Sequence, residues 1–176
     1  MNKTTLNKKL KNIKLILFDV DGVLTDGKII LDSDGKEYKN FHAHDGFGIV
    51  KAKQAGIKIG LISGRTSDIV DKRAFKLGID IVLQGIDDKL EAFQNLKKEN
   101  NFSEKETAYI GDDEFDIPLL KAVAFSAAPA NAINAVKKSV DYVTKTDGGN
   151  GAAREIIDMI LNVKNSKKKN DNKSDN

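Results

Sequence analysis

The chain alternates between short apolar runs and longer amphipathic segments, and this alternation constrains its fold more than any other feature. The apolar runs predict strands at Leu15–Phe18, Ile57–Ile62, Ile79–Leu83, Ala108–Ile110, Ala124–Ser126 and Tyr142–Val143. The intervening segments predict helices at Gly46–Ala55, Ser67–Leu77, Asp87–Asn100, Phe115–Ala122, Asn131–Lys138 and Ala152–Val163. Strands that alternate with helices across short connections favour a parallel sheet. We therefore predict an α/β fold of three layers, with a Rossmann-like parallel sheet and helices on both faces.

One segment departs from this alternation. Lys28–Leu31 and Lys36–Phe41 flank a turn that ends in Asp34-Gly35, a pattern typical of a β-hairpin. The hairpin follows the first strand directly, so we expect it to project over the same end of the sheet. The sequence has no insertion long enough to form a second domain.

A pair of carboxylates stands where the first strand should end. Asp19 and Asp21 are two residues apart and precede Gly22. Burying two such groups is costly unless a cation or a proton offsets their charge. The arrangement is uncommon in a purely structural role and suits metal-assisted phosphoryl transfer.

The other strand ends carry polar residues too. The second predicted strand leads into Ser63-Gly64-Arg65, the third leads through Gly85 to Lys89, and the fourth is followed by Gly111–Asp116. Ligands of parallel α/β sheets bind outside the carboxyl ends of the strands. These segments therefore predict one shared site.

Charge is distributed unevenly along the chain. The net charge is +3, yet residues 1–12 carry four lysines and no acid, and residues 164–176 carry five lysines and two aspartates. The body between them is therefore acidic, which argues against a nucleic-acid-binding protein. We predict a basic N-terminal arm at 1–12, a catalytic domain at 13–163 and a lysine-rich, disordered tail at 164–176.

Two features that the sequence lacks narrow the class of protein further. The sequence contains no cysteine, which excludes disulfides and thiolate chemistry. The apolar run Ile13–Phe18 is too short to span a membrane and has no signal-peptide cleavage site after it. We expect a cytoplasmic protein without a membrane partner.

Taken together, these segments resemble the signature of the haloacid dehalogenase-like phosphohydrolase superfamily. The match covers Asp-x-Asp-Gly-x-x-x-Asp at Asp19–Asp26, Ser63, Lys89, and Gly-Asp-Asp-x-x-Asp at Gly111–Asp116. The resemblance implies a phosphatase that works through an aspartyl-phosphate. Splitting a slow hydrolysis into two easier steps is the general advantage of such an intermediate.

The chemistry assigns a role to each matching residue. Asp19 is the predicted nucleophile, and Asp21 the general acid and base, whose backbone carbonyl would also face the metal. Ser63 would bind a phosphoryl oxygen, and Lys89 would neutralise phosphate charge. The oxygen ligands Asp19, Asp21 and Asp112 favour Mg²⁺.

Gly22 would leave room for the backbone to approach the phosphate. Gly64 is predicted to bind substrate as well. Asp113 and Asp116 would support the metal site directly or through water. For Asp113, stabilising the next helix through its dipole is an equally good interpretation.

The chain is similar to the capless branch of the superfamily, because neither usual insertion point holds a cap domain. Within that branch it resembles the family of 3-deoxy-D-manno-octulosonate 8-phosphate phosphatases, which act in lipopolysaccharide precursor synthesis. Distinctive stretches are Phe18–Gly27, Phe41–Ile49, Ile62–Arg65, Tyr109–Asp113 and Gly148–Glu155.

This resemblance implies a homotetramer in which hairpins form a central barrel and a neighbouring subunit completes each site. It also implies that the glycine-rich segment Gly148–Gly151 lines or covers the site. Arg65 and Arg154 would bind the carboxylate or hydroxyls of the sugar acid, since an arginine fork suits a carboxylate.

One departure leaves the substrate open. Family members often carry a basic residue at the position of Val50, whereas this chain has Lys51 one residue later. On a helix one residue corresponds to a rotation of about 100°, so Lys51 is no simple replacement. The alternatives are a phosphatase for nine-carbon sugar acid 9-phosphates, a non-catalytic oligomerisation module, and a phosphatase for nucleic-acid ends.

Several residues also have a structural interpretation. Ser63 could belong to a plain turn, Lys89 to a solvated helix face, Arg65 to a local salt bridge, and Gly148–Gly151 to an ordinary loop. His42 and His44 are expected at the surface.

Overall fold

A parallel sheet forms the centre of the protein. The structure, a computed structural model, describes residues 3–79 and 81–174. Six strands lie in the order β5-β4-β1-β6-β7-β8, and every neighbouring pair is parallel. The strands are β1 Leu15–Phe18, β4 Lys58–Ile62, β5 Ile81–Leu83, β6 Thr107–Ile110, β7 Phe125–Ala128 and β8 Tyr142–Val143.

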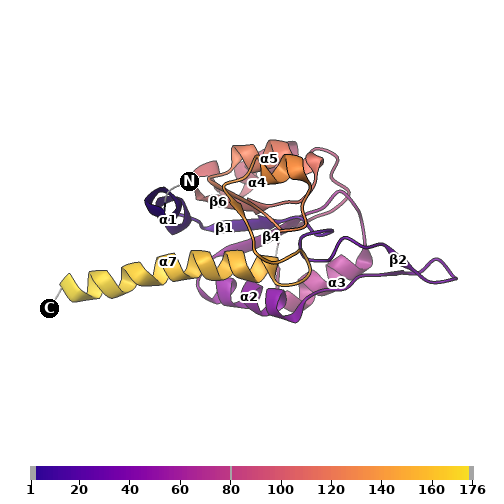
Figure 1. The fold of residues 1–176 in the computed structure, drawn as a ribbon, viewed down its shortest axis with the longest axis horizontal. Helices are drawn as coiled ribbons and strands as arrows, with labels where there is room; N and C mark the ends of the chain where they lie inside the picture. Colours follow the sequence, from indigo (N-terminus) through magenta and orange to yellow (C-terminus); the bar gives the residue numbers. More distant parts are fainter. Residues whose placement is uncertain (1–2, 80, 175–176) are drawn as a thin grey trace.

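Helices cover both faces of this sheet (Figure 1). The helices are α1 Lys3–Lys11, α2 Ala43–Gln54, α3 Asp68–Leu77, α4 Lys89–Asn100, α5 Ile117–Ala122, α6 Asn134–Lys137 and α7 Ala152–Ser174, with 3-10 turns η1 Glu104–Glu106 and η2 Glu114–Asp116. One apolar cluster joins the sheet to α1, α2, α3 and α7, and a second joins it to α4, α5 and α6. The predicted three-layer α/β fold is confirmed.

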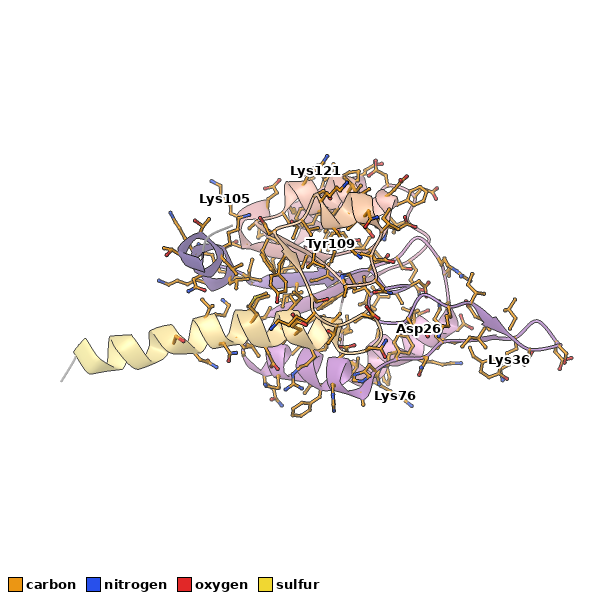
Figure 2. The ribbon with its side chains drawn as sticks, viewed as in Figure 1. Asp26, Lys36, Lys76, Lys105, Tyr109 and Lys121 are labelled. Carbon is orange, nitrogen blue, oxygen red and sulfur yellow. The ribbon has the colours of Figure 1, made fainter. Side chains whose placement is uncertain are left out.

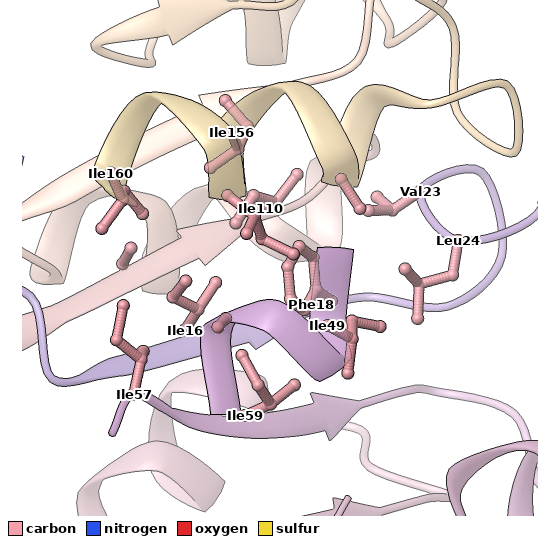
Figure 3. Close-up of a cluster of buried hydrophobic side chains, with 14 of the residues drawn as sticks. Ile16, Phe18, Val23, Leu24, Ile49, Ile57, Ile59, Ile110, Ile156 and Ile160 are labelled. Carbon is pink, nitrogen blue, oxygen red and sulfur yellow. The ribbon is translucent and has the colours of Figure 1, made fainter. Parts of the chain in front are cut away.

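The alternation of side chains along β1 explains the two clusters. Ile16 and Phe18 belong to the cluster under α2 and α7, whereas Leu15 and Leu17 belong to the cluster on the opposite face. All four are fully buried, as expected of a central parallel strand with both faces covered. Figure 3 shows Ile156 of α7 above this layer. This packing holds the end of β1, and therefore Asp19, in place.

The hairpin predicted after the first strand is present. β2, Ile30–Leu31, pairs antiparallel with β3, Glu37–Tyr38. Gly35 closes the turn with φ +78°, and Asp32 accepts backbone hydrogen bonds from Asp34 and Lys36. The hairpin extends away from the sheet, with Lys36 near its outer end and Asp26 near its base (Figure 2). In the part of the chain that the structure describes, it is the whole of the insertion after β1, and no cap domain is present.

The start of α2 differs from the predicted one at two glycines. α2 begins at Ala43, three residues before the predicted start, and includes Gly46 and Gly48. A Cβ at Gly46 would lie 2.4 Å from the Arg73 guanidinium, and one at Gly48 would lie 2.8 Å from Arg154 Cδ. The glycines thus allow close packing within the helix, and tertiary contacts offset their poor helix propensity.

Both ends of the chain contain helix. In α1 the side chain of Leu10 is fully buried, and Lys9 pairs with Asp141 at 2.6 Å. α7 continues past the predicted tail boundary as far as Ser174, and Lys164 donates a hydrogen bond to the Lys11 carbonyl at 3.1 Å. No glycine or proline after Val163 interrupts the helix that starts in the core. The division of the chain at residues 12 and 163 stays a prediction.

Candidate active site

Asp19 lies at the carboxyl end of the central strand and is almost buried. Its backbone N–H donates to the Ile110 carbonyl at 2.9 Å, which extends the ladder between β1 and β6 by one residue. Only 8% of Asp19 is exposed. One carboxylate oxygen accepts a hydrogen bond from the Val20 N–H, and the other lies 2.9 Å from Lys89 Nζ. The predicted nucleophile is therefore held by backbone and by a cation.

The other strand ends meet Asp19 in one cavity of about 460 Å³. This volume falls within the usual range of small-molecule sites. The residues that line it are Asp19, Asp21, Gly27, Ser63, Gly64, Arg65, Ile86, Asp87, Lys89, Asp112, Asp113, Phe115 and Asp116. All four predicted segments contribute to this list, as the rule for parallel sheets requires.

Three carboxylates in the cavity could approach a single cation. Oxygens of Asp19, Asp112 and Asp116 lie within 4.8 Å of one another. Asp112 Oδ1 is buried and has no hydrogen-bond partner. A buried, unpaired carboxylate oxygen is costly, and a cation with oxygen ligands removes that cost. The donor set therefore fits a hard divalent metal such as Mg²⁺.

Asp116 has a different part in this cluster from Asp19 and Asp112. It is fully buried, and its Oδ1 accepts hydrogen bonds from Lys89 Nζ at 2.7 Å and from the Tyr109 hydroxyl. Its Oδ2 accepts from the N–H groups of Asp112 and Asp113 at 2.8 and 3.0 Å. Both oxygens are engaged, so Asp116 orients the lysine and the Asp112 loop.

Burial also shifts the acidity of the site. Desolvation, reinforced by repulsion from Asp116, raises the pKa of Asp19 from 3.8 to about 7. Burial and the neighbouring charges of Asp19 and Asp116 raise the pKa of Asp112 to about 7 as well. For Lys89, burial acts to lower the pKa, but attraction to Asp19 and Asp116 outweighs it and raises the pKa. The site thus carries strongly coupled charges that a bound cation would stabilise.

Asp113 and Gly22 both have a structural task. Asp113 lines the cavity and also forms a capping box with Asp116 at the start of η2.

Gly22 has φ +87°, and a Cβ there would lie 2.0 Å from an Asp112 carboxylate oxygen. Asp112 therefore fills the space beside Gly22, and the role of Gly22 in letting the backbone approach the phosphate stays a prediction.

Lys39 is a site residue that sequence reasoning missed. Its ammonium contacts the Asp21 carboxylate and lies 3.6 Å from Glu37, and only 2% of its side chain is exposed. Glu37 in turn accepts a hydrogen bond from Arg65 at 2.8 Å. Lys39 is one of three lysines in the hairpin and lies within the predicted second arm, Lys36–Phe41, so no signal in the sequence set it apart.

Arg154 lies outside the cavity of its own chain. Its Nε donates to Asp158 at 2.6 Å, and its guanidinium lies over the ring of Phe47. Lys51 donates to the same Asp158 at 3.0 Å. Neither Arg154 nor Lys51 lines the cavity that contains Asp19, and a role for Arg154 in substrate binding stays a prediction.

Comparison with known proteins agrees with this geometry. Residues 72–156 match the haloacid dehalogenase-like hydrolase family model. The chain is 44% identical over 156 residues to the 3-deoxy-D-manno-octulosonate 8-phosphate phosphatase of Haemophilus influenzae, which covers 89% of this chain and 87% of the relative. The corresponding phosphatase of Escherichia coli is 40% identical over 153 residues, 87% of this chain and 81% of the relative. The chain belongs to the haloacid dehalogenase-like hydrolase family.

Solved structures of relatives share the whole fold of this hydrolase. The 3-deoxy-D-manno-octulosonate 8-phosphate phosphatase of Moraxella catarrhalis superimposes with a TM-score of 0.91 at 41% identity, covering 93% of this chain and 94% of the other. That crystal structure contains a magnesium ion, a phosphate ion and the sugar acid itself. A cobalt-bound form of the Haemophilus influenzae enzyme superimposes with a TM-score of 0.86 at 44% identity, covering 89% and 92%. Relatives of this hydrolase thus bind divalent metals.

Across residues 3–79 and 81–174, no helix is both long enough and apolar enough to cross a bilayer.

Proposed function

We propose that this protein is a Mg²⁺-dependent phosphomonoesterase that hydrolyses 3-deoxy-D-manno-octulosonate 8-phosphate to the free sugar acid and phosphate. The observation that carries the proposal is the meeting of Asp19, Lys89 and Asp112 in one cavity, where Asp19 and Lys89 are buried and Asp112 keeps a buried, unpaired oxygen. The proposal is supported by the family and by the sequence identity to phosphatases of that substrate. It is also supported by the crystal structure of a relative with magnesium, phosphate and the sugar acid.

The reaction has two steps. In the first, a carboxylate oxygen of Asp19 forms a bond to phosphorus while the bond from phosphorus to the ester oxygen breaks. Asp21 gives a proton to the departing sugar oxygen. In the second step water attacks the aspartyl-phosphate, Asp21 takes up the water proton, and phosphate leaves with Asp19 regenerated.

The remaining residues stabilise charge on the transferred group. Lys89, held between Asp19 and Asp116, offsets the negative charge of phosphoryl oxygens. Ser63 is 2% exposed and lines the cavity, so its hydroxyl is available to donate to a phosphoryl oxygen. Asp19 and Asp112, with the backbone carbonyl of Asp21, would hold Mg²⁺, which supplies charge neutralisation at the phosphate when bound.

The sugar end of the substrate is assigned to Arg65. Its guanidinium is held by Glu37 on the hairpin and its side chain is 45% exposed at the cavity. An arginine in this position can bind a sugar-acid carboxylate with two parallel hydrogen bonds. Arg154 does not line the cavity of its own chain, because it pairs with Asp158. It would therefore bind the sugar acid only in the site of a neighbouring subunit.

The assembly belongs to the proposal as well. We propose a cytoplasmic homotetramer in which the exposed apolar residues of the hairpin pack against other copies. Ile29 and Leu31 are 62% and 59% exposed, unusual for large aliphatic side chains in one short segment.

The alternative functions predict different results in activity measurements. A nine-carbon sugar acid 9-phosphate would give a higher kcat/KM than the eight-carbon substrate in a side-by-side panel. A nucleic-acid end phosphatase would prefer a phosphorylated oligonucleotide, and a non-catalytic oligomerisation module would release no phosphate from any ester.

The deciding experiment measures phosphate release from 3-deoxy-D-manno-octulosonate 8-phosphate with Mg²⁺, with EDTA, and for Asp19→Asn. We expect turnover with Mg²⁺ only, and a loss of at least about 10³-fold in kcat for the variant, as for other nucleophile replacements. Wild-type protein that releases no phosphate from any sugar phosphate would refute the proposal.

A further inference from the structure

The two oxygens of Asp21 have different surroundings. Oδ1 accepts hydrogen bonds from Lys39 Nζ and, at 3.4 Å, from the Thr25 hydroxyl. No hydrogen bond to Oδ2 occurs within residues 3–79 and 81–174. Asp21 lines the cavity. One oxygen is therefore anchored, and the other is left to meet a substrate.

Lys39 reaches Asp21 from the hairpin. It follows β3 directly, 18 positions after Asp21, and it does not line the cavity. Its ammonium group is buried against the carboxylates of Asp21 and Glu37. Lys39 therefore acts on the substrate only through Asp21.

The burial of this lysine marks the contact as specific. The Lys39 side chain is 2% exposed, whereas that of Lys28 on the other arm of the hairpin is 75% exposed. Removing an ammonium group from water costs several kcal/mol unless an anion replaces the lost hydration. Asp21 and Glu37 are the anions that compensate Lys39.

A chain of charges then joins the hairpin to two sides of the cavity. Lys39 binds Asp21 at the end of β1, Glu37 lies beside Lys39, and Glu37 accepts a hydrogen bond from Arg65 after β4. Displacement of the hairpin would thus move the predicted acid and base together with the arginine. The hairpin is coupled to the site by these ion pairs as well as by its peptide connection.

We propose that Lys39 is a positioning residue for the proton transfer: it anchors Oδ1 of Asp21 so that Oδ2 faces the ester oxygen of the substrate. The inference rests on the proposed function and deepens it, because nothing in the sequence motifs assigns this lysine a role. The reaction itself is unchanged, and Lys39 neither bonds to the phosphate nor exchanges a proton in it.

This role predicts a dependence on the leaving group. An alkyl phosphate such as a sugar 8-phosphate needs a proton on its departing oxygen, whereas p-nitrophenolate is stable enough to leave without one. Loss of Lys39 should therefore slow formation of the aspartyl-phosphate from the sugar phosphate and barely affect its formation from p-nitrophenyl phosphate. General acid catalysis typically raises a rate by about 10²- to 10⁴-fold, and this is the upper limit of the rate loss expected when Lys39 is replaced.

The test compares Lys39→Met with wild-type protein in rapid-quench measurements of phosphoenzyme formation with Mg²⁺. We expect a loss of about tenfold or more with the sugar phosphate and less than about threefold with p-nitrophenyl phosphate. KM for both substrates should change little, and Lys39→Arg should recover part of the lost rate. Lys36→Met is the matched control, because Lys36 lies on the same hairpin over the Tyr38 ring and remains exposed.

Equal losses with the two substrates, or no loss with either, would overturn the inference. If circular dichroism shows that Lys39→Met is unfolded, Lys39→Gln, which keeps a donor without the charge, takes its place. Unfolding of both variants would assign Lys39 to stability and also overturn the inference. Wild-type protein that hydrolyses neither ester would instead refute the proposed function, so the two failures are distinguishable.

Discussion

A single buried carboxylate, Asp116, organises the site at the scale of residues. Its oxygens accept hydrogen bonds from Lys89, Tyr109 and two backbone N–H groups of the loop that carries Asp112. Hydrogen bonds to a charged carboxylate are stronger than neutral ones. Asp116 can therefore hold a cation and a metal-binding loop in one arrangement, which leaves Asp19 and Asp112 with the freer oxygens.

The contact between Gly22 and Asp112 gives a first prediction. Gly22→Ala would place a methyl group 2.0 Å from the Asp112 carboxylate and would strain a residue with φ +87°. We expect it to displace Asp112 and to weaken Mg²⁺-dependent activity by at least about tenfold, equivalent to about 1.4 kcal/mol. The measurement is phosphate release as a function of Mg²⁺ concentration.

Gly35→Ala is the matched control for that variant. Its φ is +78°, but no atom lies within 4 Å of the added Cβ. It should lose about 1–2 kcal/mol of stability from backbone strain alone and keep its Mg²⁺ response. Similar Mg²⁺ responses in both variants would contradict the role given to Gly22.

The raised pKa values of Asp19 and Asp112 predict how pH acts on the metal. Both carboxyl groups titrate at about 7 in the folded, metal-free protein, against 3.8 when unfolded. The folded state then binds protons more tightly, so this contribution to stability is present below about pH 4 and lost as the pH rises to about 7. Mg²⁺ must displace those protons and should bind more weakly below pH 7.

Thermal unfolding at several pH values checks this second prediction. The increase in Tm caused by Mg²⁺ should be larger at pH 8 than at pH 6, and Asp112→Asn should abolish most of it. An equal increase at both pH values in wild-type protein would show that the two carboxyl groups are not protonated in the metal-free site.

At the scale of elements, the loop after β1 is held by segments from far along the chain. Gly149 N–H donates to the Val23 carbonyl at 3.0 Å, and Gly148 N–H donates to Asn131 Oδ1 at 2.9 Å. Asp45 of α2 is buried and accepts a hydrogen bond from the Arg154 N–H at 2.7 Å, in the first turn of α7. The glycine-rich segment thus packs against the Asp19–Asp26 motif and supports it.

Gly148→Ala should therefore disturb the motif loop. Its Cβ would lie 1.8 Å from the Gly22 carbonyl oxygen, a backbone atom that can move only with the loop. We expect a loss of about 1–3 kcal/mol in the free energy of unfolding, the usual cost of overpacking, together with a lower kcat. Urea unfolding and steady-state kinetics measure the two effects.

Gly151→Ala is the control for Gly148→Ala, because it strains the backbone of the same segment without adding a close contact. Gly151 has φ +107° and no atom within 4 Å of an added Cβ, so its substitution should reduce stability with a much smaller effect on kcat. An unchanged kcat in Gly148→Ala would show that the glycine-rich segment does not support the motif.

At the scale of the whole molecule, the hairpin predicts assembly. Ile29→Asp with Leu31→Asp would place charges on the exposed apolar surface of the hairpin. We expect sedimentation to change from a tetramer to a monomer, because a buried, unpaired carboxylate opposes association. Activity should fall with it, since a neighbouring subunit is proposed to complete each site.

Phe75→Asp is the control for this variant, because Phe75 is 86% exposed and belongs to α3, not to the hairpin. It should leave the sedimentation coefficient of the assembly unchanged. Sedimentation of wild-type protein as a monomer would contradict the tetramer proposal.

Much of the architecture could be predicted because its signals are local. The alternation of strands and helices and the Asp-Gly turn each act within a few residues, and they predicted the parallel sheet and its hairpin. Where the predictions failed, distant contacts decided the result: α2 starts early because Gly46 and Gly48 pack against arginines from α3 and α7.

The sequence by itself determined the fold class and the predicted nucleophile, because parallel strands bring their carboxyl ends to one edge whatever their loops contain. Only the tertiary structure decided that Lys39 binds Asp21, that Asp116 is saturated by donors, that Asp112 fills the space beside Gly22, and that Arg154 lies apart from the cavity. The contacts of Lys39 with Asp21, of Lys89 with Asp116 and of Asp112 with Gly22 join residues far apart in the chain, so they depend on which groups packing brings together. A sequence motif states which chemical groups are available, and packing decides which of them touch.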